Sequence, residues 1–196
     1  MKTFAALAIT GLLLSSAPAP YSTAFAAQQN KPQLEGKSSA SRGRTTALIA
    51  DEVRHQLVML PNYGVFDWID GTVAPDDSVT LRGFVTAPTT RSDAEARVKK
   101  LESVAKVVNQ IEVLPLSSSD DQIRLATYRA IFNYNGPLFR YATRAVPPIH
   151  IIVKNGHLTL KGVVANQMDS QLAYMAARGV SGVFDVKNEL QVEKAS

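Results

Sequence analysis

A pattern that returns at a constant spacing most limits what this chain of 196 residues can fold into. The segment 79–85, Val-Thr-Leu-Arg-Gly-Phe-Val, returns 79 residues later at 158–164 as Leu-Thr-Leu-Lys-Gly-Val-Val. A second block, 104–113, returns at 183–192 with the same spacing. Two blocks that share one offset are poorly explained by chance, so the sequence predicts two copies of one supersecondary unit.

The two copies differ near their starts. Apolar or small side chains recur there every four residues, as on one face of a helix: Ile49, Val53 and Leu57, then Ile123, Thr127 and Ile131. These two sets are 74 residues apart rather than 79. We therefore expect five extra residues between the first helix and the first strand of the second copy.

Each copy has the pattern of a helix, a hairpin, a second helix and a last strand. Because an apolar sheet face has to be buried, the helices are expected to cover one face of the sheet. The predicted fold class is α+β, with two tandem αββαβ domains, each a small mixed three-stranded sheet with two helices packed on one face. We place the domains at 44–114 and 120–193, joined by a linker at 115–119.

Local signals predict individual elements. The first helix of the second copy is expected at 120–132, with Asp120 as its N-cap. The Asn-Gly pair at 155–156 predicts a hairpin, because a type I′ turn needs positive φ at both central positions. The second helices are expected at 92–102 and 168–178. The apolar face of the later one is expected to consist of Leu172, Met175 and Ala176.

The N-terminal segment 1–26 has the pattern of a cleaved signal peptide. Lys2 precedes an apolar run, and Ala-Phe-Ala ends the segment with the small residues that a signal peptidase requires. The apolar run is too short to span a bilayer, so we expect an exported chain that begins at Ala27. Residues 27–43 contain a single large apolar side chain, Leu34, and are expected to form a flexible basic arm.

Composition gives little sign of catalysis. The chain has no cysteine, which excludes disulfides, thiolate chemistry and Cys-ligated metals. Its three histidines, at 55, 150 and 157, have no evident set of partners, and neither a nucleophile elbow nor a phosphate-binding glycine loop occurs. We expect no enzyme activity, no metal and no cofactor.

Arginines alternate with aromatic residues in the second copy. Arginine binds phosphate in a bidentate manner, and aromatic rings settle at the level of lipid headgroups, so the segment is a candidate lipid-binding surface. Its candidate residues are Arg124, Tyr128, Arg129, Tyr134, Phe139, Arg140, Tyr141 and Arg144. The alternative interpretation is that Tyr128 and Phe132 belong to the core and that the arginines are merely solvated.

The ends of the two copies resemble the BON domain family, whose pattern closes with spaced Val, Gly, Val, Val, Asn, Leu and Val. The second copy matches that close in full with Val180, Gly182, Val183, Val186, Asn188, Leu190 and Val192. The first copy has Leu101, Ser103 and Ile111 at three of these places. The resemblance implies an αββαβ fold, a periplasmic location, no enzyme activity, contact with phospholipid or membrane surfaces, and a role in envelope integrity or osmotic-stress tolerance.

Five residues of the shared pattern are expected to be structural: Gly83, Asn109, Gly162, Gly182 and Asn188. A glycine inside a strand suggests a bulge or a close approach of another segment. A glycine in the turn before the last strand suits a positive φ. Because Ser103 replaces glycine in that turn, the first copy is expected to have a different or slightly strained turn there.

Two classes of function follow from these observations. The first is an exported module that binds anionic phospholipid or a membrane surface. The second is a periplasmic protein-interaction or chaperone-like factor with envelope proteins as partners. A nucleic-acid partner is disfavoured by export and by a net charge of only +4. The sequence leaves the oligomeric state open.

Overall fold

The computed structural model describes residues 39–193, with side chains from residue 45 onward. The predicted signal peptide and most of the predicted arm lie outside the described residues. The end of that arm is helical, because the first helix begins at Ser39 rather than after residue 43.

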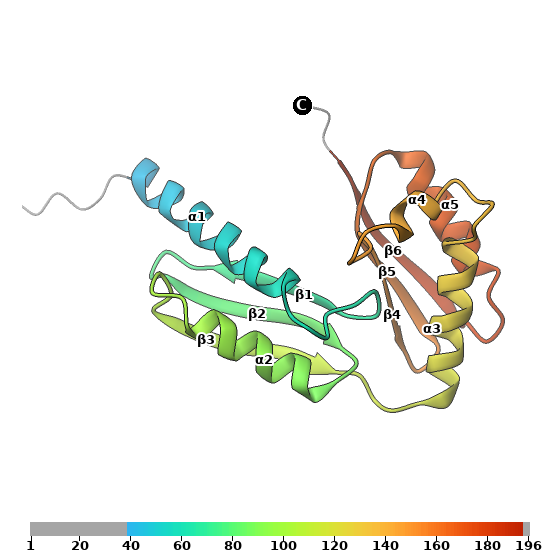
Figure 1. The fold of residues 1–196 in the computed structure, drawn as a ribbon, viewed down its shortest axis with the longest axis horizontal. Coiled ribbons are helices and arrows are strands. Elements are labelled where there is room, and N and C mark those ends of the chain that lie inside the picture. Colours follow the sequence, from blue (N-terminus) through green and yellow to red (C-terminus); the bar gives the residue numbers. More distant parts are fainter. Residues whose placement is uncertain (1–38, 194–196) are drawn as a thin grey trace, which may run out of the picture. The chain divides into compact units, whose positions relative to one another are not determined.

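Two domains follow one another along the chain, each with the expected order of elements (Figure 1). The first contains α1 (Ser39–Val58), β1 (Trp68–Val73), β2 (Ser78–Val85), α2 (Pro88–Lys99) and β3 (Lys106–Val113). The second contains α3 (Ser118–Ile131), α4 (Phe139–Ala142), β4 (Ile149–Lys154), β5 (His157–Val164), α5 (Gln167–Arg178) and β6 (Asp185–Val192).

Each domain has a mixed three-stranded sheet, which confirms the predicted fold class. In the first sheet the middle strand β2 pairs antiparallel with β1 and parallel with β3. In the second sheet β5 pairs in the same way with β4 and β6. Parallel neighbours need a crossover connection, and α2 and α5 provide it. Figure 1 shows α1 and α2 on one face of the first sheet.

Each domain has its own core between the sheet and the helices. The buried apolar residues of the first core are Ile49, Val53, Leu57, Leu60, Ile69, Val79, Leu81, Val85, Ala94, Val98 and Ile111. Those of the second core include Ile123, Ile131, Phe132, Ile149, Ile151, Val153, Leu158, Leu160, Val164, Ala173 and Ala177. The four-residue periodicity of both first helices therefore marks their buried faces.

The hairpin turns differ between the copies. Asn155 and Gly156 have φ values of 52° and 77°, the conformation that a type I′ turn requires. In the first copy Asp77 is left-handed with a φ of 60°, and the Ala74 amide donates to the Ser78 carbonyl across a longer turn. The first hairpin is therefore one residue longer than the second.

This difference corrects the expected position of the extra residues. Ile69 pairs with Gly83 in the first sheet, and Ile149 pairs with Gly162 in the second. The first strands are therefore 80 residues apart, whereas the helices before them are 74 apart and the later strands 79. The second copy has six extra residues before β4 and one fewer in its hairpin. The short helix α4 lies in the added segment.

Replacing Asp77 by glycine is expected to raise the free energy of unfolding by up to about 1 kcal/mol, because only glycine adopts positive φ without a steric cost. The change can be measured by urea denaturation followed by fluorescence of Trp68, the single tryptophan of the chain. The control is Asp76→Gly, which removes a carboxylate that accepts from the Ser78 amide at 3.2 Å and hydroxyl at 2.7 Å. Equal losses of stability in both variants would contradict the prediction.

The two strand glycines allow the backbones of neighbouring strands to approach closely. Gly83 and Gly162 have φ values of 134° and 121°, a region that other residues rarely adopt. A Cβ atom on Gly83 would collide with the Trp68 carbonyl oxygen, and one on Gly162 with the Pro148 carbonyl oxygen. The crowding atoms thus lie at the start of the first strand of each hairpin, on Trp68 of β1 and on Pro148 directly before β4, and not on a helix.

The paired asparagines connect the last strand to the second helix. The Asn188 amide nitrogen donates to the Ser170 carbonyl at 3.3 Å, and its oxygen accepts from the Leu190 amide at 3.2 Å. Asn109 makes the corresponding bonds to the Arg91 carbonyl at 3.2 Å and from the Ile111 amide at 3.1 Å. One residue type therefore anchors the edge strand in both domains.

The turn before the last strand differs between the copies. Gly182 has a φ of 88°, whereas Ser103 does not have a positive φ. The Ser103 hydroxyl instead donates to the Glu52 carboxylate of α1 at 2.8 Å. The first copy accommodates serine by a different turn.

Candidate functional site

Two of the predicted lipid-binding residues on α3 point into the domain. Arg124 is only 4% exposed, and its guanidinium donates to the Val153 carbonyl at 2.7 Å and to the Asp121 carboxylate. Tyr128 is half-buried and its ring packs against Phe132. The interpretation of Arg124 as a phosphate ligand is corrected by this placement, because the guanidinium is buried and both of its terminal nitrogens donate within the protein.

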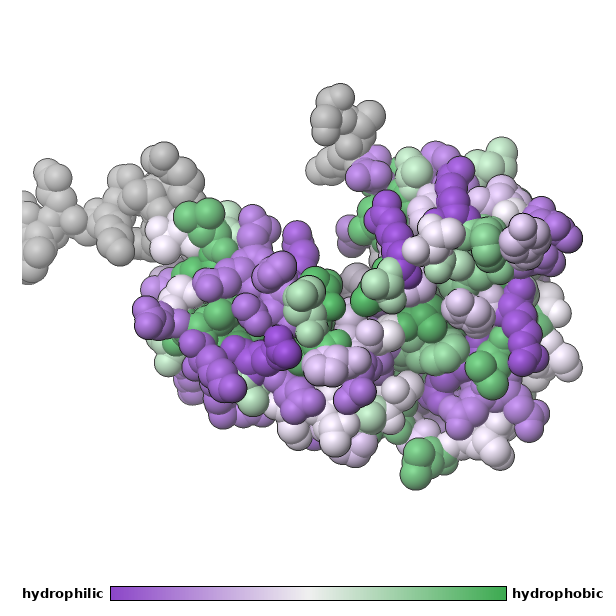
Figure 2. All heavy atoms as spheres, viewed as in Figure 1, coloured by the Kyte–Doolittle hydropathy of each residue, from purple (hydrophilic) through white to green (hydrophobic). Residues whose placement is uncertain are grey.

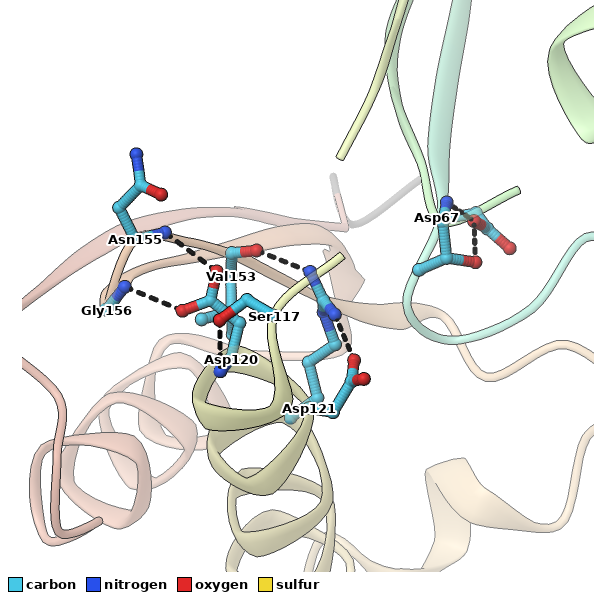
Figure 3. A network of polar contacts seen from close by, with 9 residues as sticks. Asp67, Ser117, Asp120, Asp121, Val153, Asn155 and Gly156 are labelled. Carbon is cyan, nitrogen blue, oxygen red and sulfur yellow. Dashed lines mark hydrogen bonds and ion pairs between the residues drawn. The ribbon is translucent and has the colours of Figure 1, made fainter. Parts of the chain in front are cut away.

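Asp120 also has a different role from the one predicted. The N-cap of α3 is Ser117, whose hydroxyl accepts from the Asp120 amide at 3.2 Å. The buried Asp120 carboxylate accepts from the amides of Asn155 at 2.8 Å and Gly156 at 2.9 Å (Figure 3). It thereby joins the start of α3 to the turn between β4 and β5.

The added segment is fixed to α5 by a second buried carboxylate. The Tyr141 hydroxyl donates to Asp169 at 2.6 Å and accepts from the Ala165 amide at 2.9 Å. Arg140 forms an ion pair with the same carboxylate and lies over the Tyr141 ring. Tyr141 is buried, so it is removed from the predicted surface, whereas the Arg140 side chain stays partly exposed.

Besides Arg140, three of the predicted residues are accessible at the surface. Arg129 and Arg144 are exposed, and so is Tyr134, at 78%. Phe139 is half-buried and packs its ring edge-on against Tyr134 with 5.0 Å between centroids. The structure therefore keeps only part of the predicted arginine–aromatic set available for a ligand.

Sequence reasoning missed an exposed apolar stripe on α5. Met168 and Met175 are 63% and 60% exposed, although Met175 was expected in the core. The buried residues of α5 include Ala173 and Ala177 instead, and the two methionines lie on the opposite side of the helix. Their spacing of seven residues, two helical turns, was the signal available in the sequence.

A matching stripe lies on α3, which packs beside α5. Leu125 is 48% exposed and Arg129 follows it by one turn, both opposite the buried Ile123 and Thr127. We call Leu125, Arg129, Met168, Met175 and Arg178 the α3–α5 face. Figure 2 shows hydrophobic residues interspersed with hydrophilic ones on the side of the second domain that α3 crosses.

The charge of the α3–α5 face is positive. The two helices contain three acidic residues, of which Asp120 and Asp169 are buried and Asp121 is paired with Arg124. Arg129 and Arg178 are exposed, and the Arg178 guanidinium lies 5.7 Å from the ring centroid of Tyr174. No large hydrophobic residue is exposed on α2, the corresponding helix of the first domain.

The aromatic side chains around the start of β1, Tyr63 and Trp68, pack against His150. The segment before β1 is held by Asp67, a buried carboxylate that accepts from the Thr86 amide at 2.7 Å (Figure 3). Tyr63 and Trp68 lie 5.5 and 5.2 Å from the buried His150 ring, measured between centroids. Burial lowers the pKa of His150 and raises the pKa of Tyr63 to about 12.

Within residues 39–193 no helix is both long and apolar enough to cross a membrane. The same part of the chain contains no cluster of three or more histidine, aspartate or glutamate side chains arranged to hold a metal ion.

Comparison with protein families matches the BON domain to residues 45–115 and again to 120–194. The chain belongs to the BON domain family. The two matched segments correspond to the two copies seen in the sequence and to the two sheets of the structure. The BON domain is generally non-catalytic, and the family is associated with phospholipid binding and osmotic stress.

Other comparisons add little about this BON protein. A search of curated protein sequences finds no match. Two solved structures of CdsD, a structural protein of the type III secretion system of Chlamydia trachomatis, show weak similarity. The C-terminal domain structure has 14% identity and a TM-score of 0.27, and the alignment covers 74% of this chain and 96% of that one. The other has 13% identity, a TM-score of 0.31 and coverage of 76% and 93%.

Proposed function

We propose that this chain is an exported, non-enzymatic protein of the periplasm whose second BON domain docks on anionic phospholipid through the α3–α5 face and supports envelope integrity or osmotic-stress tolerance. The observation that carries the proposal is the pairing of exposed apolar residues with arginines on one side of α3 and α5, two helices in which every acidic residue is buried or paired. The signal-peptide pattern of residues 1–26 supports the location.

Simple electrostatics indicates how strongly this face can bind. A basic residue close to an anionic membrane contributes about 1 kcal/mol, and this attraction fades within a Debye length of about 10 Å at 0.1 M salt. Arg129 and Arg178 together therefore supply about 2 kcal/mol, or about a 30-fold gain in affinity. The exposed leucine and methionines add contact with the acyl boundary, as on amphipathic interfacial helices. The expected binding is reversible and salt-sensitive.

Reversing both arginines is expected to weaken binding to phosphatidylglycerol vesicles by at least about 30-fold at low salt, because two attractive charges become two repulsive ones. The measurement is vesicle flotation of the chain from Ala27 onward carrying Arg129→Glu and Arg178→Glu. The matched control is Arg91→Glu with Lys100→Glu in the first domain, which changes the net charge equally at two exposed positions. Equal losses in both double variants would contradict a site on the α3–α5 face.

A second candidate is a protein-interaction or chaperone-like factor for envelope proteins. It is favoured by β3 and β6, which are edge strands that each pair with one neighbour in the described sheets. An extended segment of a client could add to such an edge by main-chain hydrogen bonds. Under this alternative the chain suppresses aggregation of an unfolded envelope protein in the absence of vesicles, and the docking variants retain that effect.

A further inference from the structure

All three methionines in the described part of the chain are exposed. Met59, Met168 and Met175 are 59%, 63% and 60% exposed, and neither core contains a methionine. Methionine usually fills irregular gaps in protein interiors, so this placement is unusual. Because the chain has no cysteine, its thioethers are its only sulfur groups.

Two of these thioethers lie within the proposed docking surface. Met168 and Met175 are two turns apart on α5, and Arg178 continues the same side of the helix. The α5 backbone does not depend on their side chains for packing, because Ala173 and Ala177 fill the core side. Met59, which directly follows the end of α1, offers an exposed thioether in the other domain.

We propose that Met168 and Met175 are oxidation sites that release the second domain from anionic membranes when hydrogen peroxide is present. The inference rests on the proposed docking function. Each thioether sulfur attacks one peroxide oxygen, so that an S–O bond forms and the O–O bond breaks. The sulfur loses two electrons to become a sulfoxide, and the peroxide is reduced to water. The reaction needs only an accessible thioether and a peroxide.

Oxidation opposes docking for a physical reason. Methionine sulfoxide is polar, so a flexible apolar side chain becomes one that favours water over the acyl boundary. With both methionines oxidised, affinity for anionic vesicles is expected to fall by about tenfold or more, the scale of one apolar side chain kept out of a hydrophobic environment. The fold is expected to persist, because neither side chain packs in the core.

The test compares vesicle flotation of the chain from Ala27 onward before and after peroxide treatment, with peptide mapping by mass spectrometry. We expect oxidation at both sites, weaker binding to phosphatidylglycerol vesicles, an unchanged circular dichroism spectrum, and recovery after treatment with methionine sulfoxide reductases. The affinity of the variant Met168→Leu with Met175→Leu, whatever its starting value, should be the same before and after peroxide treatment. The control Met59→Leu should remain sensitive.

The possible failures are distinguishable. If the untreated chain does not bind phosphatidylglycerol vesicles, the docking function itself is overturned, and the switch with it. If the untreated chain binds but full oxidation of both methionines leaves its affinity unchanged, only the switch is overturned. The switch is equally overturned if the double leucine variant still loses binding, or if oxidation abolishes binding by unfolding the chain.

Discussion

The variant Gly162→Ala is expected to lower the free energy of unfolding of the second domain by about 3 kcal/mol or more. A Cβ atom at this position would clash with the Pro148 carbonyl oxygen. The φ of 121° adds a cost for every residue other than glycine. To relieve this clash, β4 and β5 would have to separate where Ile149 pairs with Gly162. That separation would weaken the hydrogen bonds between the two strands. Urea denaturation followed by far-ultraviolet circular dichroism measures the loss.

Gly179 supplies the control for that variant. It caps α5 with a φ of −77°, and the nearest atom to an added Cβ lies 3.6 Å away. Gly179→Ala should therefore be neutral or slightly stabilising, since alanine reduces the entropy of the unfolded chain. If the Gly162 and Gly179 variants proved equally stable, the close approach of β4 and β5 would not be the reason for the strand glycine.

The variant Asp120→Ala is expected to cost about 3 kcal/mol of unfolding free energy. Truncation leaves the amides of Asn155 and Gly156 without the carboxylate that now accepts from both, and hydrogen bonds to charged groups contribute about 1.5–3 kcal/mol each. The start of α3 would also lose its connection to the β4–β5 turn. The same denaturation measurement reports the effect.

A graded series separates the charge of Asp120 from its shape. Asp120→Asn keeps one oxygen acceptor, so its free energy of unfolding should fall clearly less than that of the alanine variant. Because Asp120 is buried, its replacement by alanine should change the free energy of unfolding by far more than the roughly 0.5 kcal/mol that is usual at a surface site. If the free energy of unfolding of the alanine variant changed only by that amount, solvent would be replacing the carboxylate at the turn, and the prediction would be wrong.

Features encoded by nearby residues were predictable from the sequence. The repeat, the helical periodicity of residues 49–57 and the Asn-Gly turn all depend on short-range patterns, and the structure confirms them. The boundaries of α2 were less well predicted, because the expected helix at 92–102 begins four residues earlier at Pro88. Proline suits the first turn of a helix, where its missing amide hydrogen is not needed.

Features that depend on distant partners were not predictable in this way. Arg124 is buried because the Val153 carbonyl, 29 residues away, accepts from it. Tyr141 is buried because Asp169, 28 residues away, accepts its hydroxyl hydrogen bond. Both residue types are common at surfaces, and no local pattern identifies such an acceptor. Met175 is exposed because the small residues Ala173 and Ala177 allow close packing of α5 on the core.

One measurement tests the central claim most directly: flotation of the chain from Ala27 onward with phosphatidylglycerol and with phosphatidylcholine vesicles, each at low salt and at 0.5 M salt. The proposed docking by Arg129 and Arg178 predicts binding to the anionic vesicles at low salt, strong weakening at high salt, and little binding to the neutral vesicles. Equal binding to both vesicle types, or no binding to either, would contradict it.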